Sequence, residues 1–316
     1  MFPFMRQLTL GILIFNDGEY LEQLLNSIDN QKDKNFNLLI INNASTDLSQ
    51  SIVTNFINLR HDYEVNVVNN PKNFGSFLGT KQLILNASTS HLSIIHGDDL
   101  LKNNYVEIAN SYIKLYPDFC AFNFDLEEIE GIKNVTTGRI ISSNWTNSKL
   151  MNRLLVSGLN PGVMPGAIIS INKLGDSYQI TEIEDMKLNG TEDIFLWQQI
   201  VRSSKKIMRI PVTTYAYRRH SGQISKNYNI YSFNLGYMRK VNFLTAKTKI
   251  EKILCISEIR YEYKAVNYDK SYLEGLDYLI KYKEYSVFRF INVIIRRFAN
   301  LVNKNQFATF PNDKDL

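Results

Sequence analysis

Residues 92–101 read LSIIHGDDLL, an apolar run of strand length that ends in a histidine, a glycine and two adjacent aspartates. One interpretation of two acids at the point where a buried strand leaves the core is a metal and phosphate site. The other is an acidic turn, or the N-terminal cap of a helix over 102–116. The place of this stretch in the fold decides between them.

Three apolar runs of strand length precede this stretch: LTLGILIF (8–15), NLLII (37–41) and EVNVV (64–68). Runs that are apolar on both faces favour a parallel sheet covered on both sides. Helical periodicity lies between and after the runs, over residues 20–28, 48–59, 77–85 and 105–115. This alternation predicts an α/β fold, a Rossmann-like, open, mostly parallel sheet flanked by helices, in which ligands bind at the carboxyl ends of the strands.

Polar segments follow all four predicted strands: FNDGEY (15–20), NNASTD (42–47), NNPKNFG (69–75) and HGDD (96–99). Asn, Asp and Gly dominate ordinary turns, so any one of these segments is explained by turn chemistry. Four in order, the last with a carboxylate pair, favour a binding site at this edge of the sheet.

The composition fits a folded protein with a sizeable core, since 44% of the 316 residues are hydrophobic and 21% charged. The two cysteines, Cys120 and Cys255, give neither a disulfide framework nor zinc spacing, so we expect a reducing, cytoplasmic compartment. No signal peptide and no membrane-spanning run is recognisable. Residues 247–304 hold 12 basic and 7 acidic residues, which accounts for the net charge of +5 and favours a local partner there over nucleic-acid binding.

The second half of the chain is more mixed. We interpret 119–130 as a strand followed by an acidic loop, 159–171 as a Pro/Gly-rich loop that runs into a strand, and 207–210 as a short strand. Residues 191–201 begin a helix, and 215–225 are aromatic and basic. From about 230 the pattern is helical, which predicts a boundary near 225 and a helical C-terminal region over 226–316.

Taken in order, these segments resemble inverting family 2 glycosyltransferases, which have the GT-A fold. The resemblance covers about residues 7–225, implies that 1–225 is a nucleotide-sugar-binding catalytic domain, and fits the family in order and spacing. It rests on Phe15-Asn16 with Glu19-Tyr20-Leu21, on 42–47, Asn73-Phe74-Gly75 and 96–99, and on Glu192-Asp193 and Tyr217-Arg218-Arg219-His220 with Ser225.

The resemblance implies a role for each of several side chains. Asp99 and His220 would bind Mg²⁺ or Mn²⁺, and Asp193 would be the general base. Helix physics alone offers another interpretation of Asp193, because acids in a first turn stabilise the helix macrodipole. The residues expected to bind the sugar-nucleotide donor are Phe15, Asn16, Glu19, Asn43, Lys81, Asp98 and Arg218.

The sequence departs from the family pattern at three places. Asn43 stands where an acid commonly contacts the nucleotide base, although its amide can still bond a uracil edge, so a UDP-sugar is the donor we expect. Thr80 and Lys81 replace the usual Arg and Asn, and Lys81 partly supplies the missing cation. His96 replaces the first acid of the metal motif.

Residues 285–304 form a candidate amphipathic helix, with basic and Asn side chains on one face, apolar side chains on the other and no acid. This pattern favours a helix in a membrane interface, here the cytoplasmic face of the inner membrane, but a packing helix or a dimer interface explains it equally well. The function we expect is transfer of a sugar to a glycan or polyprenyl-linked acceptor in surface polysaccharide biosynthesis. The alternative is a catalytically inactive nucleotide-sugar-binding protein or a membrane-surface assembly protein.

Overall fold

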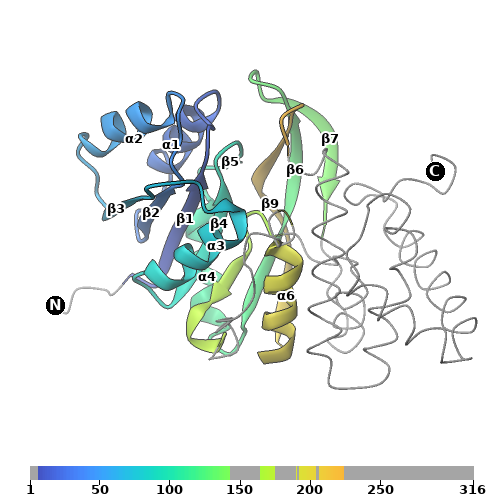
Figure 1. Ribbon diagram of the computed structural model, residues 1–316. Coiled ribbons are helices and arrows are strands. Elements are labelled where there is room, and N and C mark those ends of the chain that lie inside the picture. Colours follow the sequence, from blue (N-terminus) through green and yellow to red (C-terminus); the bar gives the residue numbers. More distant parts are fainter. Residues whose placement is uncertain (1–5, 143–163, 175–189, 191, 204–205, 224–316) are drawn as a thin grey trace, which may run out of the picture.

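The computed structural model describes residues 6–142, 164–174, 190, 192–203 and 206–223 (Figure 1). The predicted alternation of strands and helices over the first hundred residues is confirmed. Its elements are β1 (Leu8–Ile14), α1 (Leu21–Asp29), β2 (Asn37–Asn42), α2 (Ser49–Ile57), β3 (Val65–Asn69), α3 (Gly75–Asn86) and β4 (His91–His96).

The first four strands lie in the order β3-β2-β1-β4, and all their pairings are parallel. The chain moves outward from β1 to β3 and then crosses to the other side of β1 to form β4. The strand order therefore reverses between β1 and β4, and such a reversal opens a crevice at the carboxyl ends of these two strands.

The remaining elements extend the sheet and cover it. They are β5 (Leu100–Leu101), α4 (Tyr105–Leu115), β6 (Ala121–Glu130), β7 (Val135–Ile141), β8 (Ile168–Ser170), the 3₁₀ helix η1 (Ile171–Lys173), α6 (Glu192–Ser203) and β9 (Ile207–Arg219). β8 runs antiparallel to β4 and β6, whereas β9 runs parallel to β6 and antiparallel to β5. The predicted α/β class, an open sheet flanked by helices, is thus confirmed. The sheet as a whole is mixed, because β5, β7 and β8 add antiparallel pairings to the parallel strands β3-β2-β1-β4.

Three details of the predicted strands are wrong. The segment predicted as an acidic loop continues β6 to Glu130, because Glu127 pairs with Lys102 and Glu128 with Arg139. The short strand predicted at 207–210 runs to Arg219, since it stays paired with β6. β3 is only partly buried, because it is the edge strand beside β2.

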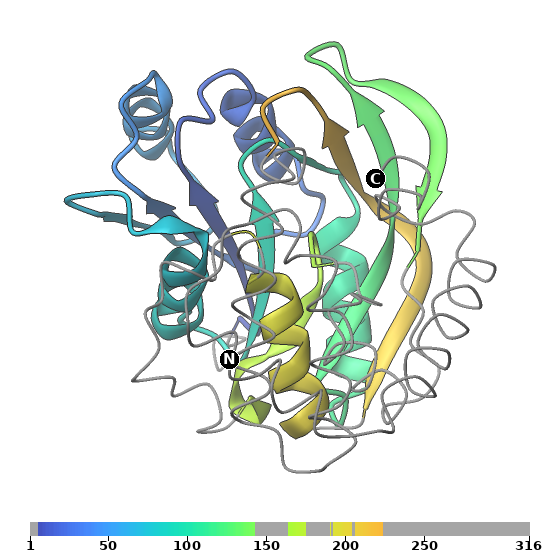
Figure 2. The same ribbon diagram turned by 45° about the vertical axis from the view of Figure 1, so that its right-hand side comes forward.

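Two layers of buried side chains lie on opposite faces of the sheet. One contains the apolar faces of α1, α2 and α4, and the other contains those of α3 and α6. Figure 2 shows α6 lying across the front of the sheet. Gly79 lets α3 lie close to β1, because a Cβ there would come within 2.4 Å of Leu13 Cδ1. This close packing sets the start of α3 near the carboxyl edge of the sheet.

The region predicted to be helical, 226–316, lies outside the described residues, as do Ser225 and the candidate amphipathic helix 285–304. Among the residues that the structure does describe, no helix is both long and apolar enough to cross a bilayer.

Candidate active site

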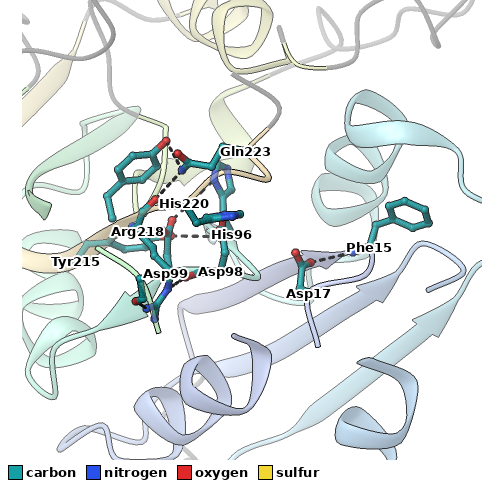
Figure 3. Close-up of polar contacts among 11 residues, drawn as sticks. Phe15, Asp17, His96, Asp98, Asp99, Tyr215, Arg218, His220 and Gln223 are labelled. Carbon is teal, nitrogen blue, oxygen red and sulfur yellow. Dashed lines mark hydrogen bonds and ion pairs between the residues drawn. The ribbon is translucent and has the colours of Figure 1, made fainter. Parts of the chain in front are cut away.

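The loops after β1 and β4 meet at the reversal of strand order. Asp17 follows β1 and packs against Gly97, where a Cβ would lie 2.4 Å from Asp17 Oδ2. Figure 3 draws Asp17 beside the group formed by His96, Asp98 and Asp99. The HGDD turn thus lies where an open α/β sheet binds its ligands, as expected from its position in the sequence.

Asp99 is fully buried and joins the HGDD turn to β9. Its Oδ2 accepts a hydrogen bond from the Tyr215 hydroxyl at 2.7 Å, and its Oδ1 accepts one from the Arg218 backbone N–H at 2.7 Å. Burial, with the charge of Asp98, raises the pKa of Asp99 well above its ordinary value despite these bonds. A cation at this place would therefore relieve an electrostatic cost that the fold imposes.

Asp98 is the more accessible of the two acids, with 19% of its side chain exposed. Its Oδ2 lies 2.8 Å from Nε2 of His220, and the ring of His220 packs against Tyr20 of the loop before α1 with a centroid separation of 4.9 Å. Burial alone would raise the pKa of Asp98, but the hydrogen bond to His220 and the charges of His96 and His220 lower it. His220, which directly follows β9, thus lies against the HGDD turn.

One ligand atom from each of His96, Asp98 and Asp99 lies within 4.8 Å of the others. The Nδ1 atom of His96 is 3.9 Å from Asp99 Oδ2, and 44% of the His96 side chain is exposed. Two carboxylates and an imidazole form a donor set that fits a divalent cation such as Mn²⁺.

Arg218 is buried, and its guanidinium contacts several groups of the protein. It donates to the backbone oxygens of Asp98 and Gly131 and to the side-chain oxygens of Asn134 and Gln23, and it lies 4.8 Å from the Tyr20 ring centroid. Arg218 thus connects the backbone of the HGDD turn to α1 and to the loop after β6. The placement favours a supporting role over the direct donor contact predicted for Arg218.

Asn43 is also buried in a network of the protein's own groups. Its Oδ1 accepts from Asn70 Nδ2 and from Phe74 N–H, and its Nδ2 donates to Asn73 Oδ1 and to the Gly75 carbonyl. The residue predicted to contact the nucleotide base thus ties the end of β2 to the loop before α3.

Of the other predicted donor-binding residues, Phe15, Asn16 and Glu19 lie in the loop after β1, whereas Lys81 lies in the middle of α3. Phe15 is 43% exposed at the end of β1, Glu19 is exposed, and Lys81 is half-buried on α3. Asn16 has a φ of 59° and accepts a hydrogen bond from Thr46 N–H at 2.8 Å. These positions leave Phe15 and Glu19 available for contact with a bound molecule.

Asp193 lies in the first turn of α6, half-buried, and its Oδ1 accepts from Ile194 N–H at 2.7 Å. The preceding Glu192 accepts a hydrogen bond from Ser76, the second residue of α3, at 2.8 Å. Since α3 begins beside the end of β2, this contact brings the start of α6 to the edge of the sheet that carries the HGDD turn.

One further acid at this edge, Asp17, was not predicted from the sequence as a site residue. Its Oδ2 accepts from Phe15 N–H at 2.9 Å. The pKa of Asp17 is raised to about 7, mainly by burial and also by the charges of Asp98 and Asp47. The hydrogen bond from Phe15 N–H and the charge of His220 lower it in part. An acidic residue directly after β1 was the available signal, but turn chemistry accounts for it equally well.

We expect Asp17→Asn to remove a pH dependence of stability. An unfolded Asp17 loses its proton near the ordinary pKa of 3.8, whereas the folded one keeps it until about 7. Between these values the folded state binds more protons, so the contribution of Asp17 to stability falls as pH rises. In metal-free urea unfolding, Asp17→Asn should therefore gain stability relative to wild type between pH 4 and pH 8. A difference that stays constant with pH would contradict the assignment.

The comparisons with known proteins agree on a family. Residues 9–166, half of the chain, match the family described as Glycosyl transferase family 2. Glycosyltransferase GlyA of Streptococcus pneumoniae serotype 4 is 23% identical over 225 residues, which make up 70% of this chain but only 32% of GlyA. Among solved structures, S. aureus TarS 1–349 in complex with UDP-GlcNAc has a TM-score of 0.60 at 16% identity, over 81% of this chain and 72% of that one. Mannosyltransferase PcManGT from Pyrobaculum calidifontis, in complex with GDP-Man and Mn²⁺, has a TM-score of 0.55 at 12% identity, over 96% and 89%.

The strand order, the helices on both faces and the structural neighbours define the fold as that of the GT-A glycosyltransferases. Within that class, the chain belongs to glycosyl transferase family 2. The resemblance inferred from the sequence motifs is thereby confirmed.

Proposed function

We propose that the protein transfers a sugar, with inversion at the anomeric carbon, from a nucleotide-diphosphate donor to a hydroxyl of an acceptor. The observation that carries this proposal is that two acidic groups lie at the same edge of the sheet. Asp98 and Asp99 lie after β4, and Glu192-Asp193 begins α6, which is bonded to α3 at the same edge. One group suits a charged leaving group, and the other suits the attacking hydroxyl.

For the donor we propose a UDP-sugar. TarS has been solved with UDP-GlcNAc and PcManGT with GDP-Man, which supports a nucleotide sugar of either base. The exposed ring of Phe15 offers a surface on which the base can stack, and Glu19 and Asn16 lie next to it in the chain. Because the Asn43 side chain is already bonded within the protein, base selection is better assigned to the loop after β1.

For the cofactor we propose Mn²⁺ or Mg²⁺, held by Asp98 and Asp99 with His96 and His220 beside them. When bound, the ion would balance the charge that develops on the diphosphate, as a Lewis acid does. The imidazole of His96, which replaces a carboxylate of the family pattern, favours Mn²⁺ over Mg²⁺ because Mg²⁺ prefers oxygen ligands.

For the general base we propose Asp193. Its carboxylate accepts the proton of the acceptor hydroxyl while that oxygen forms a bond to the anomeric carbon. The bond from the anomeric carbon to the diphosphate oxygen breaks on the opposite face, and the nucleoside diphosphate leaves with the electron pair. The start of a helix favours the negative charge that a base must carry.

We further propose that 1–225 is the catalytic domain and that the acceptor is a glycan or polyprenyl-linked sugar of surface polysaccharide synthesis, reached at the cytoplasmic face of the inner membrane. The basic, amphipathic pattern of 285–304 supports a membrane-bound acceptor. Removing 285–316 should then abolish binding of the purified protein to anionic vesicles, and an intact chain that never binds them would contradict this part.

The proposed activity can be tested with a panel of sugar nucleotides. Purified protein is incubated with UDP-, GDP- and dTDP-sugars and either Mn²⁺ or Mg²⁺, with and without lipid-linked acceptors, and binding and turnover are measured. We expect binding of a UDP-sugar that is stronger with Mn²⁺, and a product of inverted configuration. A panel in which no donor binds or is consumed would contradict the proposed function.

A further inference from the structure

Two helices that are distant in the chain begin side by side at the active-site edge. Ser76 in the first turn of α3 donates from its hydroxyl to Glu192 Oε2 at 2.8 Å and accepts from the Gly190 backbone N–H at 2.9 Å. A serine hydroxyl has one donor and two acceptor positions, so one side chain can hold both partners. Ser76 therefore forms hydrogen bonds both to Gly190, which precedes α6, and to Glu192, the first residue of α6.

An apolar contact accompanies this polar one. The rings of Phe77 and Phe195 meet edge to face with a centroid separation of 5.4 Å, one from each helix. The side chains of Ile194, Leu196 and Trp197 are buried in the layer that α6 shares with α3. Core packing thus fixes the body of α6, whereas Ser76 contacts the turn that carries Asp193.

Ser76 itself is held by a well-bonded loop. The Gly75 carbonyl accepts from Asn43 at 3.2 Å, the Phe74 N–H donates to Asn43 at 2.9 Å, and the Gly75 N–H donates to Asn73 at 2.7 Å. Asn43 lies at the end of β2, so the loop is fixed to the parallel sheet. Ser76 connects this rigid edge to the start of α6.

We propose that Ser76 is a positioning residue that sets the orientation of Asp193 through Glu192 and Gly190. The proposal rests on the proposed function, in which Asp193 is the base. A base must be held close to the geometry of proton transfer, and a displacement of about 1 Å can cost about 100-fold in rate. The Ser76 contacts restrain the backbone on which Asp193 is carried, without any contact between Ser76 and the substrates being required.

The test compares Ser76→Ala and Ser76→Thr in steady-state kinetics of the full chain with the donor found in the panel. Ser76→Ala should lower kcat by roughly 10- to 100-fold and change the donor KM by less than about twofold, because the donor site is left intact. Ser76→Thr keeps the hydroxyl and should restore most of kcat. Ser51→Ala is the matched control, since Ser51 also lies in a first turn, that of α2, and donates only to its own helix at Leu48; it should behave as wild type.

Other outcomes overturn the proposal. Full kcat in Ser76→Ala, or equal losses in Ser76→Ala and Ser76→Thr, would exclude a role for the hydroxyl. If Ser76→Ala does not fold, Glu192→Gln is compared with Glu192→Ala. Glutamine keeps an oxygen that accepts the serine proton, whereas alanine does not. Equal kcat in these two variants would likewise exclude a role for the Ser76 hydroxyl. If the wild-type protein turns over no donor, the proposed function is contradicted instead. In that case hydrogen exchange at Gly190, which should be faster in Ser76→Ala, decides whether Ser76 restrains the start of α6.

Discussion

Asp193→Asn should lower kcat for sugar transfer by about 1,000-fold while leaving donor affinity nearly unchanged. Asparagine has almost the same shape as aspartate, so the first turn of α6 and its contact with Ser76 should persist. It cannot accept a proton from the acceptor hydroxyl, and general base catalysis typically contributes 10²- to 10⁴-fold. The expected loss therefore falls on the chemical step.

This result is checked by measuring donor affinity by calorimetry and transfer by product formation on the same preparation. Glu107→Gln is the matched control, because Glu107 is an exposed acid in the first turn of α4 and belongs to none of the motifs. It should keep full activity. Retained transfer in Asp193→Asn would assign the base elsewhere, whereas loss of donor binding together with transfer would show that Asp193 helps to hold the donor.

The first half of the fold could be predicted because its signals are local. β1, β2 and β4 are almost wholly buried, so their sequences are mainly apolar, and α1 and α4 repeat apolar residues at helical spacing. β6 was harder to predict, because its acidic half reads as a loop. Partners on other elements, such as Lys102 for Glu127, are what allow those acids to lie in a strand.

The site could be predicted only in part. The edge of the sheet, the HGDD turn and the proximity of His220 followed from strand order and motif order. The internal bonds of Arg218 and Asn43 did not, because they join residues far apart in sequence and no motif pairs them. Asp17 and Ser76 belong to ordinary turn and helix-start patterns, and only packing distinguishes them.

The two acids of the HGDD turn should respond differently to the same change. Asp98→Asn should weaken Mn²⁺ binding by more than about 100-fold and abolish metal-dependent donor binding, since loss of a direct ligand should exceed the 10- to 100-fold typical of supporting groups. Stability should change little, because Asp98 is partly exposed and its partner His220 can bond to the amide oxygen of asparagine.

Asp99→Asn should weaken Mn²⁺ binding as strongly and also destabilise the fold, by about 1–3 kcal/mol at low pH, where the carboxyl is neutral in both states. This loss should shrink as pH rises, because the raised pKa of Asp99 costs the wild-type fold stability there. Its two oxygens accept from the Tyr215 hydroxyl and the Arg218 N–H inside the protein, with no exposure to water. An amide group offers one oxygen in place of two, so one buried donor loses its acceptor. Asp99 would then both bind the cation and hold β9 against the HGDD turn.

Titration of Mn²⁺ by electron paramagnetic resonance, with urea unfolding of each variant in the absence of metal, separates these effects. Asp118→Asn is the control, because Asp118 is an acid with 78% of its side chain exposed that pairs with Lys206 on the surface. Neither measurement should change. Unaltered Mn²⁺ affinity in Asp98→Asn would remove Asp98 from the metal site. Reduced stability with normal Mn²⁺ affinity in Asp99→Asn would leave Asp99 a structural acid, and the cation would then depend on Asp98 with His96 and His220.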